Sequence, residues 1–340
     1  MTKPLVVLSA VVLFLSAAQR APATHRLEAT PNTIAYGWYD AAGSPVLRIA
    51  SGDIIDVDTL LTNTPQGLRR AGVPEDQIQE SLKRITEAFP QGDSKRGPGG
   101  HILTGPVFVE GAEPGDALEV KILSIDLAIP YGYNGCQGFL PENCPTPRAP
   151  ARIIQLDPKT MTAVFAPGIV IPLHPFFGSM GVAPPPEAGR VSSNPPGTHA
   201  GNLDNKSLVA GTSLFIPVHA PGALFEVGDG HAAQGDGEVD QTAIETSLRG
   251  RLQLTVRKGM ELNFPRAETP TDYISMGTDE DLAKATKIAI QEMVDFLVAN
   301  KHLDKVAAYQ LTSVAGNVAI TQLVDGNVGV HVKMPKEIFK

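Results

Sequence analysis

The sequence has few of the residues that mark several common functional classes. Among 340 residues there are one Trp and two Cys, and 28 Lys and Arg stand against 36 Asp and Glu. A formal net charge of −8 without a basic stripe argues against a protein that binds nucleic acid. Neither cysteine has a cationic cluster or a nucleophile signature beside it, and no G-x-S-x-G elbow occurs. Thiol-based and serine-based catalysis therefore have little support.

Long apolar runs are also scarce, and the only marked one lies at the N-terminus. Lys3, the run from Leu5 to Leu15 and Ala21-Pro22-Ala23 are typical of a secretory signal, and the run is too short to span a bilayer comfortably. We expect a signal peptide at residues 1–23, a mature catalytic domain at 24–340 and an exported, periplasmic or secreted protein without a membrane span. An uncleaved anchor or a buried N-terminal strand is the alternative.

The two cysteines, Cys136 and Cys144, flank a short loop-like stretch. In an oxidising compartment they are expected to form a disulfide that stabilises the fold by roughly 2–3 kcal/mol. Two free thiols are the alternative.

The chain is rich in turn residues, with 33 Gly and 29 Pro, and its regular segments are mostly strand-like. The stretch 116–127 alternates apolar and polar residues with a period of two, which predicts a half-buried strand. Further strands are predicted at 46–49, 54–61, 152–156, 161–165, 214–218, 248–256, 318–324 and 329–334.

Three segments have helical periodicity. They are 75–89, a helix opened by Thr278 with Asp281 completing a capping box, and a shorter helix at 304–311. Because strands outnumber helices and do not alternate with them regularly, we predict an α+β, β-rich fold. Its layered β-sheets would carry a few peripheral helices.

The densest group of acidic residues lies in a glycine-rich block. It contains Asp229, His231, Asp236, Glu238, Asp240 and Glu245, with glycines at positions 228, 230, 235 and 237. Glycines allow a loop to approach a ligand closely, and carboxylates with an imidazole are suitable ligands for a divalent metal. One histidine is too few for a zinc triad, so other segments would have to contribute. An ordinary glycine-rich turn between two strands is the alternative.

Two other loops contain candidate ligands. His199, Asn202 and Asp204 lie close together in sequence, and His101 precedes Thr104-Gly105-Pro106. Asx-turns are the alternative for the first group, and a solvated or hydrogen-bonded histidine is the alternative for His101.

Several of these runs together resemble the acetamidase/formamidase family. The resemblance rests on 222–239, on 104–116, and on His199 to Asp204, which is similar to the family's H-G-G-N-x-D element. Glu268-Thr269-Pro270 and Met276-Gly277 add to it. Ala200 departs from the family pattern, because it stands where a glycine is usual.

The resemblance implies hydrolysis of a short amide, such as formamide or acetamide, to ammonia and a carboxylate. It also implies a β-rich fold, a homodimer or larger homo-oligomer, and a bound divalent metal, with zinc expected first and calcium as the alternative. Glu238 is the expected base and Asn202 an expected oxyanion donor. The expected metal ligands are His231 with a subset of His101, His199, Asp204 and Asp229.

Two alternatives remain open from the sequence. One is an enzyme of the same fold acting on a larger amide, an imide or an ester, since a pocket discriminates one methylene by only about 1–3 kcal/mol. The other is a secreted protein that binds a metal or a small ligand without turnover, with the acidic block as a calcium site.

Overall fold

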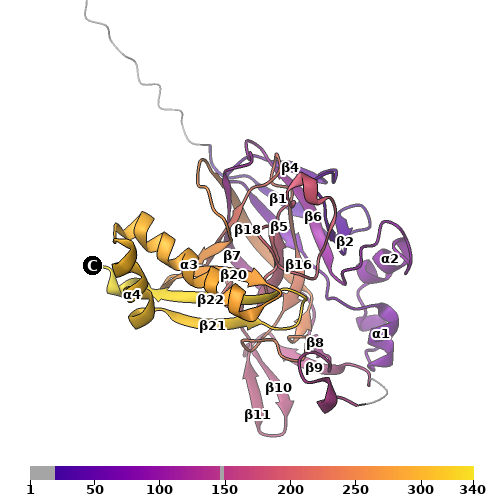
Figure 1. Cartoon of the computed structure of the whole chain (residues 1–340). Helices are drawn as coiled ribbons and strands as arrows, with labels where there is room; N and C mark the ends of the chain where they lie inside the picture. The colour runs from indigo at the N-terminus through magenta and orange to yellow at the C-terminus, as the bar shows by residue number, and fades with distance from the viewer. Residues whose placement is uncertain (1–19, 146–148) are drawn as a thin grey trace, which may run out of the picture.

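The computed structural model describes residues 20–145 and 149–340, and two large sheets dominate them (Figure 1). The expected signal peptide, 1–23, lies almost entirely outside the described residues. In the described part of the chain, a nine-stranded sheet has the order β1-β5-β18-β7-β15-β19-β20-β22-β21. Its strands are β1 Thr24–Leu27, β5 Ile54–Asp58, β7 Ala117–Leu127, β15 Ser213–Pro217, β18 Leu248–Arg257, β19 Arg266–Glu268, β20 Asp272–Asp279, β21 Asn317–Gln322 and β22 Val328–Pro335.

The second sheet of the described residues has eleven strands. Its main path is β11-β10-β9-β8-β17-β16-β12-β14, and β6 joins it by pairing with β16, β2 and β4. Its strands are β2 Ile34–Tyr36, β4 Leu47–Ile49, β6 Ile102–Val109, β8 Tyr131–Asn134, β9 Arg152–Asp157, β10 Thr162–Ala166, β11 Ile169–Pro172, β12 Phe176–Gly181, β14 Ala200–Asn202, β16 Phe225–His231 and β17 Glu245–Thr246. A small pair, β3 Trp38–Tyr39 and β13 Val191–Ser192, completes the strands described.

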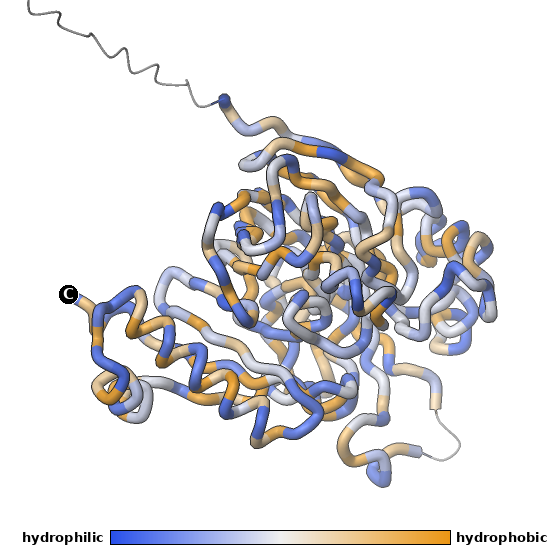
Figure 2. The backbone as a smooth tube through the Cα atoms, turned by 45° about the horizontal axis from the view of Figure 1, so that its top comes forward, coloured by the Kyte–Doolittle hydropathy of each residue, from blue (hydrophilic) through white to orange (hydrophobic). Residues whose placement is uncertain are grey.

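The main core lies between the two large sheets. Val120 and Leu252 of the nine-stranded sheet belong to one buried cluster with Val107, Phe177 and Val227 of the eleven-stranded sheet. Their alternation along each strand places apolar side chains on the inner faces, which is how two stacked sheets bury a common core. In Figure 2 the hydrophobic segments gather through the centre of the molecule.

The helices lie at the periphery, as predicted (Figure 1). Helix α3 packs against β20 and β22, and α4 packs against α3 and β22, whereas α1 and α2 lie at the opposite side of the molecule. The bounds are α1 Pro65–Arg70, α2 Glu80–Ala88, α3 Leu282–Lys301 and α4 Lys305–Ala315, with the 3-10 turns η1 Glu75–Gln77, η2 Pro141–Asn143, η3 Pro186–Ala188 and η4 Lys336–Ile338. The β-rich α+β fold with layered sheets is therefore confirmed. Among the described residues, no helix has the length and apolarity needed to cross a membrane.

Two helix boundaries differ from the prediction. Thr278 does not open a helix, because it lies in β20; the N-cap of α3 is Asp281, whose side chain accepts the backbone N–H of Lys284 at 2.9 Å. The predicted single helix at 75–89 is divided, because Ile78 adopts an extended conformation after η1.

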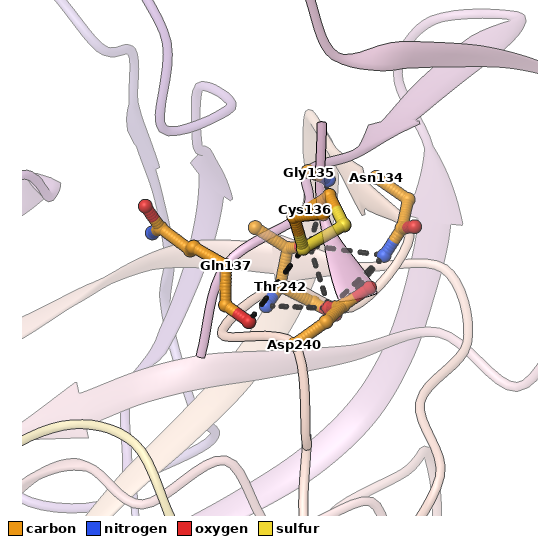
Figure 3. The surroundings of a disulfide bond; sticks show 7 residues. Asn134, Gly135, Cys136, Gln137, Asp240 and Thr242 are labelled. Carbon is orange, nitrogen blue, oxygen red and sulfur yellow. Dashed lines mark hydrogen bonds between the residues drawn. A yellow bond between two sulfur atoms is a disulfide. The ribbon is translucent and has the colours of Figure 1, made fainter. Parts of the chain in front are cut away.

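The disulfide expected from the sequence is confirmed. Cys136 and Cys144 form a disulfide, and their loop lies beside the glycine-rich block (Figure 3).

Candidate functional site

Strand β16 supplies the first two site residues. The prediction of a loop is wrong for Asp229 and His231, because both lie in this strand, and all its residues are buried. Residues two apart in a strand project from the same face, so the two side chains lie side by side. The strand is distorted at Asp229, whose φ of +55° lies in the left-handed region that non-glycine residues rarely adopt.

A neighbouring strand adds a second carboxylate. In β17, Glu245 pairs directly opposite His231. The Nε2 atom of His231 lies 3.2 Å from Glu245 Oε1 and 3.3 Å from Asp229 Oδ2. One ligand atom from each of these three residues lies within 4.8 Å of the others, so they form a compact group that a metal ion could occupy.

The orientation of the His231 ring is fixed by Gln234. The Nδ1–H group of His231 donates to Gln234 Oε1 at 2.9 Å, since an amide oxygen can only accept. The amide nitrogen of Gln234 in turn donates to the backbone carbonyl of Asp204 at 2.7 Å. With Nδ1 donating to Gln234, Nε2 is the nitrogen that faces the carboxylates and that would bind a metal, an arrangement typical of a metal-binding histidine.

A second set of ligand atoms converges on the same imidazole. Asp204, His231 and Glu238 also place one ligand atom each within 4.8 Å of the others. Asp204 follows β14 and is oriented by Asn202, whose amide group donates to Asp204 Oδ2 at 2.8 Å. Asn202 itself accepts a hydrogen bond from Ser179 at 2.7 Å. The role of Asn202 seen in these contacts is to hold a carboxylate in place.

His101 reaches the site from the start of β6. Its Nδ1–H donates to the backbone carbonyl of Ser193 at 3.1 Å, and its Nε2 lies 3.7 Å from Asp229 Oδ2. The other oxygen of Asp229 accepts a hydrogen bond from Thr62 at 2.8 Å. His101 therefore presents the same nitrogen as His231 to the same carboxylate.

His199, also expected as a ligand, is not among these groups. Within the described residues, it belongs to neither set of converging ligand atoms. Its ring packs edge-on against Tyr39, with centroids 5.0 Å apart. Burial, with a contribution from His219, lowers the pKa of His199 to about 4, so the ring is neutral at pH 7. The loop 199–204 thus contributes Asn202 and Asp204 to the lining of the site, whereas the ring of its histidine packs on Tyr39.

The electrostatics favour a bound cation. Burial and neighbouring carboxylates raise the pKa of Asp204 and Glu238 well above the ordinary range. Burial alone would lower the pKa of His231, but Glu245 and Asp229 outweigh it and raise that pKa. The pKa of Asp229 falls despite burial, because His101 and His231 lie beside it. A buried excess of negative charge of this kind calls for positive charge at its centre.

Buried polar atoms without hydrogen-bond partners also indicate a bound cation. Four buried atoms at the site have no hydrogen-bond partner among the described residues: Asp204 Oδ1, His231 Nε2, Glu238 Oε2 and Glu245 Oε2. Buried polar atoms are normally paired, so a convergent set without partners fits the nitrogen and oxygen ligands of a divalent metal.

Gly178 in β12 leaves the space that such an ion needs. A Cβ atom added there would lie 2.5 Å from Asp204 Oδ1, 2.5 Å from Asp229 Oδ2 and 2.9 Å from His231 Cε1. Any side chain at this position would therefore enter the space between the ligand atoms.

A cavity of about 610 Å³ opens onto this cluster. Asn202, Asp204, Asp229, Glu238 and Glu245 line it together with His101, Thr62, Tyr133, Cys136, Gln137 and Asp325. Burial raises the pKa of Asp325 to about 6. The site is thus a set of buried carboxylates and imidazoles at the base of an open cavity.

Comparison with known proteins identifies the family. The model of the acetamidase/formamidase family matches residues 98–192 and 187–340, which include every residue of this cluster. The chain belongs to the acetamidase/formamidase family.

Sequence identity to individual relatives is consistent with membership of this family. The chain is 30% identical over 197 residues to a putative formamidase of Schizosaccharomyces pombe, a match that covers 41% of this chain and 47% of the relative. It is 29% identical over 204 residues to an acetamidase of Mycolicibacterium smegmatis, covering 41% of this chain and 49% of the relative. The matches thus span about half the length of these curated relatives.

The fold is shared over a greater length. A crystal structure of an acetamidase from Yersinia enterocolitica superposes with a TM-score of 0.79 at 27% identity, covering 96% of both chains. The layered β-rich architecture is therefore that of the acetamidase/formamidase family.

Four site residues were not assigned roles from the sequence. Gln234 and Asp325 gave no signal beyond loop and turn composition, and Glu245 was one acid among several in the glycine-rich block. Gly178 also gave none, because its role depends on what lies opposite it in space. Ala200, by contrast, retains the left-handed backbone (φ +64°) expected of the glycine usual there in the acetamidase/formamidase family.

Proposed function

We propose that the protein is a metal-dependent hydrolase that converts a short amide, such as formamide or acetamide, to ammonia and a carboxylate. The observation that carries the proposal is the convergence of unpartnered buried atoms around His231, at the base of an open cavity. Membership of the acetamidase/formamidase family supplies the class of substrate.

The ligand set we propose is one converging group, His231, Asp229 and Glu245, together with Asp204 of the other group, and His101 lies adjacent. Imidazole with carboxylate favours zinc, whereas calcium takes six to eight oxygen ligands, so zinc is the metal we propose. When bound, such a cation polarises a carbonyl group and lowers the pKa of a water molecule that it contacts.

Glu238 is the residue we propose as the general base. Its carboxylate faces the cavity with Oε2 unpartnered, and burial raises its pKa well above the ordinary range. A raised pKa suits a carboxylate that accepts a proton from water and passes it to the departing nitrogen. Asn202, which also lines the cavity, uses one of its two amide hydrogens on Asp204 and has the other to donate to a developing oxyanion.

Changing Glu238 to Gln tests the assignment of the base. The amide keeps the size of the side chain but cannot accept the proton, so kcat should fall about 100-fold while bound zinc is retained. Steady-state kinetics with metal analysis of the same sample measures both. If Glu238→Gln kept wild-type kcat, the base would be another carboxylate of the cluster.

Export and self-association belong to the proposal as well. The signal pattern at residues 1–23 and the disulfide Cys136–Cys144 favour an oxidising, periplasmic or extracellular location. The resemblance to the family favours a homodimer or a larger homo-oligomer.

Ammonia release from a panel of amides, before and after treatment with a chelator, tests the function as a whole. We expect hydrolysis of formamide and acetamide, loss of most activity on chelation and recovery when zinc is restored. Ammonia release from a larger amide, or acid release from an imide or an ester measured by titration, would instead change the substrate assignment. Metal binding without hydrolysis of any of these compounds would favour a binding protein and overturn the proposal.

A further inference from the structure

A second, larger cavity lies beside the one described above. It has a volume of about 910 Å³, and apolar side chains such as Phe165, Ile171 and Ile244 line much of it. The two cavities share Glu238 and Thr242 in their linings. The segment 238–242, called the wall segment here, therefore separates the reaction cavity from an apolar one.

The two faces of the wall segment belong to different cavities. Val239 and Asp240 line the apolar cavity, whereas Gln241 lines the reaction cavity. A displacement of this segment would therefore change the shape of the reaction cavity and move Glu238 with it.

The wall segment has no regular secondary structure to hold it. It contains neither helix nor strand, and Glu238 and Gln241 have φ values of +42° and +70°. Non-glycine residues rarely adopt this region unless their surroundings impose it. Part of this conformation is held within the segment, where the N–H of Gln241 donates to the carbonyl of Glu238 at 2.9 Å, and the N–H of the preceding Gly237 donates to the carbonyl of Thr321 at 3.0 Å. The other contacts come from neighbouring segments.

These contacts come from the stretch that leads into the disulfide, as Figure 3 shows, and from the loop that the disulfide closes. The amide of Asn134 donates to Thr242 Oγ1 at 2.9 Å, and the backbone N–H of Gly135 donates to the same oxygen at 2.8 Å. Within the loop, the N–H of Phe139 donates to the carbonyl of Val239 at 2.8 Å.

The loop also packs tightly on the wall segment. A Cβ atom added at Gly138 would lie 2.4 Å from the carbonyl oxygen of Val239, so the two backbones are in direct contact. Cys136 and Gln137 line the reaction cavity themselves.

We propose that the disulfide-closed loop Cys136–Cys144, together with Asn134 and Gly135 that lead into it, is a positioning element that fixes the wall segment. It keeps Glu238 directed into the reaction cavity and keeps that cavity closed towards the apolar one. The loop would thereby restrict the enzyme to short amides. This inference rests on the proposed function for its kinetic consequences, but the immobilisation of the wall segment does not depend on it.

The double substitution Cys136→Ser and Cys144→Ser tests this proposal. We expect kcat for acetamide to fall about tenfold, because small misplacements of a catalytic group cost up to 100-fold. The KM for acetamide should change little, and kcat/KM for hexanamide relative to acetamide should rise. Hydrogen–deuterium exchange should increase at residues 238–242 while bound zinc stays stoichiometric.

Two further variants keep the test decisive if the double variant does not fold. Asn134→Ala leaves the disulfide intact but removes the side-chain bond to Thr242, and it should change kcat, selectivity and exchange in the same directions. Glu142→Gln, at an exposed position of the same loop, should behave as wild type.

The outcomes separate this inference from the proposed function. Unchanged kcat, unchanged selectivity and unchanged exchange in a folded double variant, or in Asn134→Ala, would overturn it. If the wild-type protein hydrolyses no amide, the proposed function fails. Hydrogen–deuterium exchange at residues 238–242 is then the only test of the positioning role. Increased exchange confined to that segment supports the positioning role, and unchanged exchange refutes it.

Discussion

Replacing His231 with alanine is expected to remove the bound metal and the hydrolysis of amides together. His231 belongs to both groups of converging ligand atoms, so its loss leaves carboxylates without the imidazole that they share. Activity should fall by at least about 10⁴-fold, because several kcal/mol of transition-state stabilisation depend on the metal and each 1.4 kcal/mol is about tenfold. Metal analysis and ammonia release from the same preparation measure the two losses.

His174→Ala is the matched control. His174 is an exposed histidine outside the cluster, so its removal should leave zinc content and kcat unchanged. Full activity of a metal-stripped His231→Ala protein would refute the assignment of His231 as a ligand, and with it the metal-dependent mechanism.

The strands with one solvated face were the most predictable parts of the fold. The alternating stretch 116–127 becomes β7 at Ala117–Leu127, and 248–256 becomes β18 at Leu248–Arg257. In these strands the period of two records which side chains face the core.

The glycine-rich strand β16 could not be predicted in this way. Glycine and aspartate indicate turns, yet here the glycines serve close packing between strands. A Cβ added at Gly228 would lie 2.5 Å from the carbonyl oxygen of Ile102, and one at Gly230 would lie 2.6 Å from that of Thr246. Composition alone cannot distinguish a glycine needed for a turn from a glycine needed for a neighbouring strand.

The candidate site, like the fold, could be predicted from the sequence only in part. His231, Asp229, Asp204 and His101 were expected as ligands, and the structure brings these four together. His199 was expected with them, but its ring packs against Tyr39 instead. Sequence proximity to Asn202 and Asp204 could not reveal this, because the direction of a side chain on an irregular loop depends on backbone angles that no motif encodes.

Gly178, which has no side chain, provides the most direct test of the geometry of the site. Gly178→Ala should abolish metal binding and activity without removing any ligand. The added methyl group would lie 2.5 Å from both Asp204 Oδ1 and Asp229 Oδ2, in the space between them. Neither oxygen can yield easily: Asn202 holds the Asp204 carboxylate and Thr62 holds that of Asp229. We expect a loss of activity as large as that of His231→Ala, measured by zinc titration and by ammonia release.

Gly235→Ala is the control that separates this effect from a general intolerance of alanine. A Cβ at Gly235 meets no atom within 4 Å, so this variant should bind zinc and hydrolyse acetamide like the wild type. In the absence of metal, Gly178→Ala should unfold at a lower temperature than Gly235→Ala, because its methyl group overpacks a buried site. Added zinc should raise the midpoint for Gly235→Ala alone, because a ligand stabilises only the protein that binds it. A Gly178→Ala protein that binds zinc with wild-type affinity would show that the metal lies elsewhere, since no ion could share the space between Asp204, Asp229 and His231 with a methyl group.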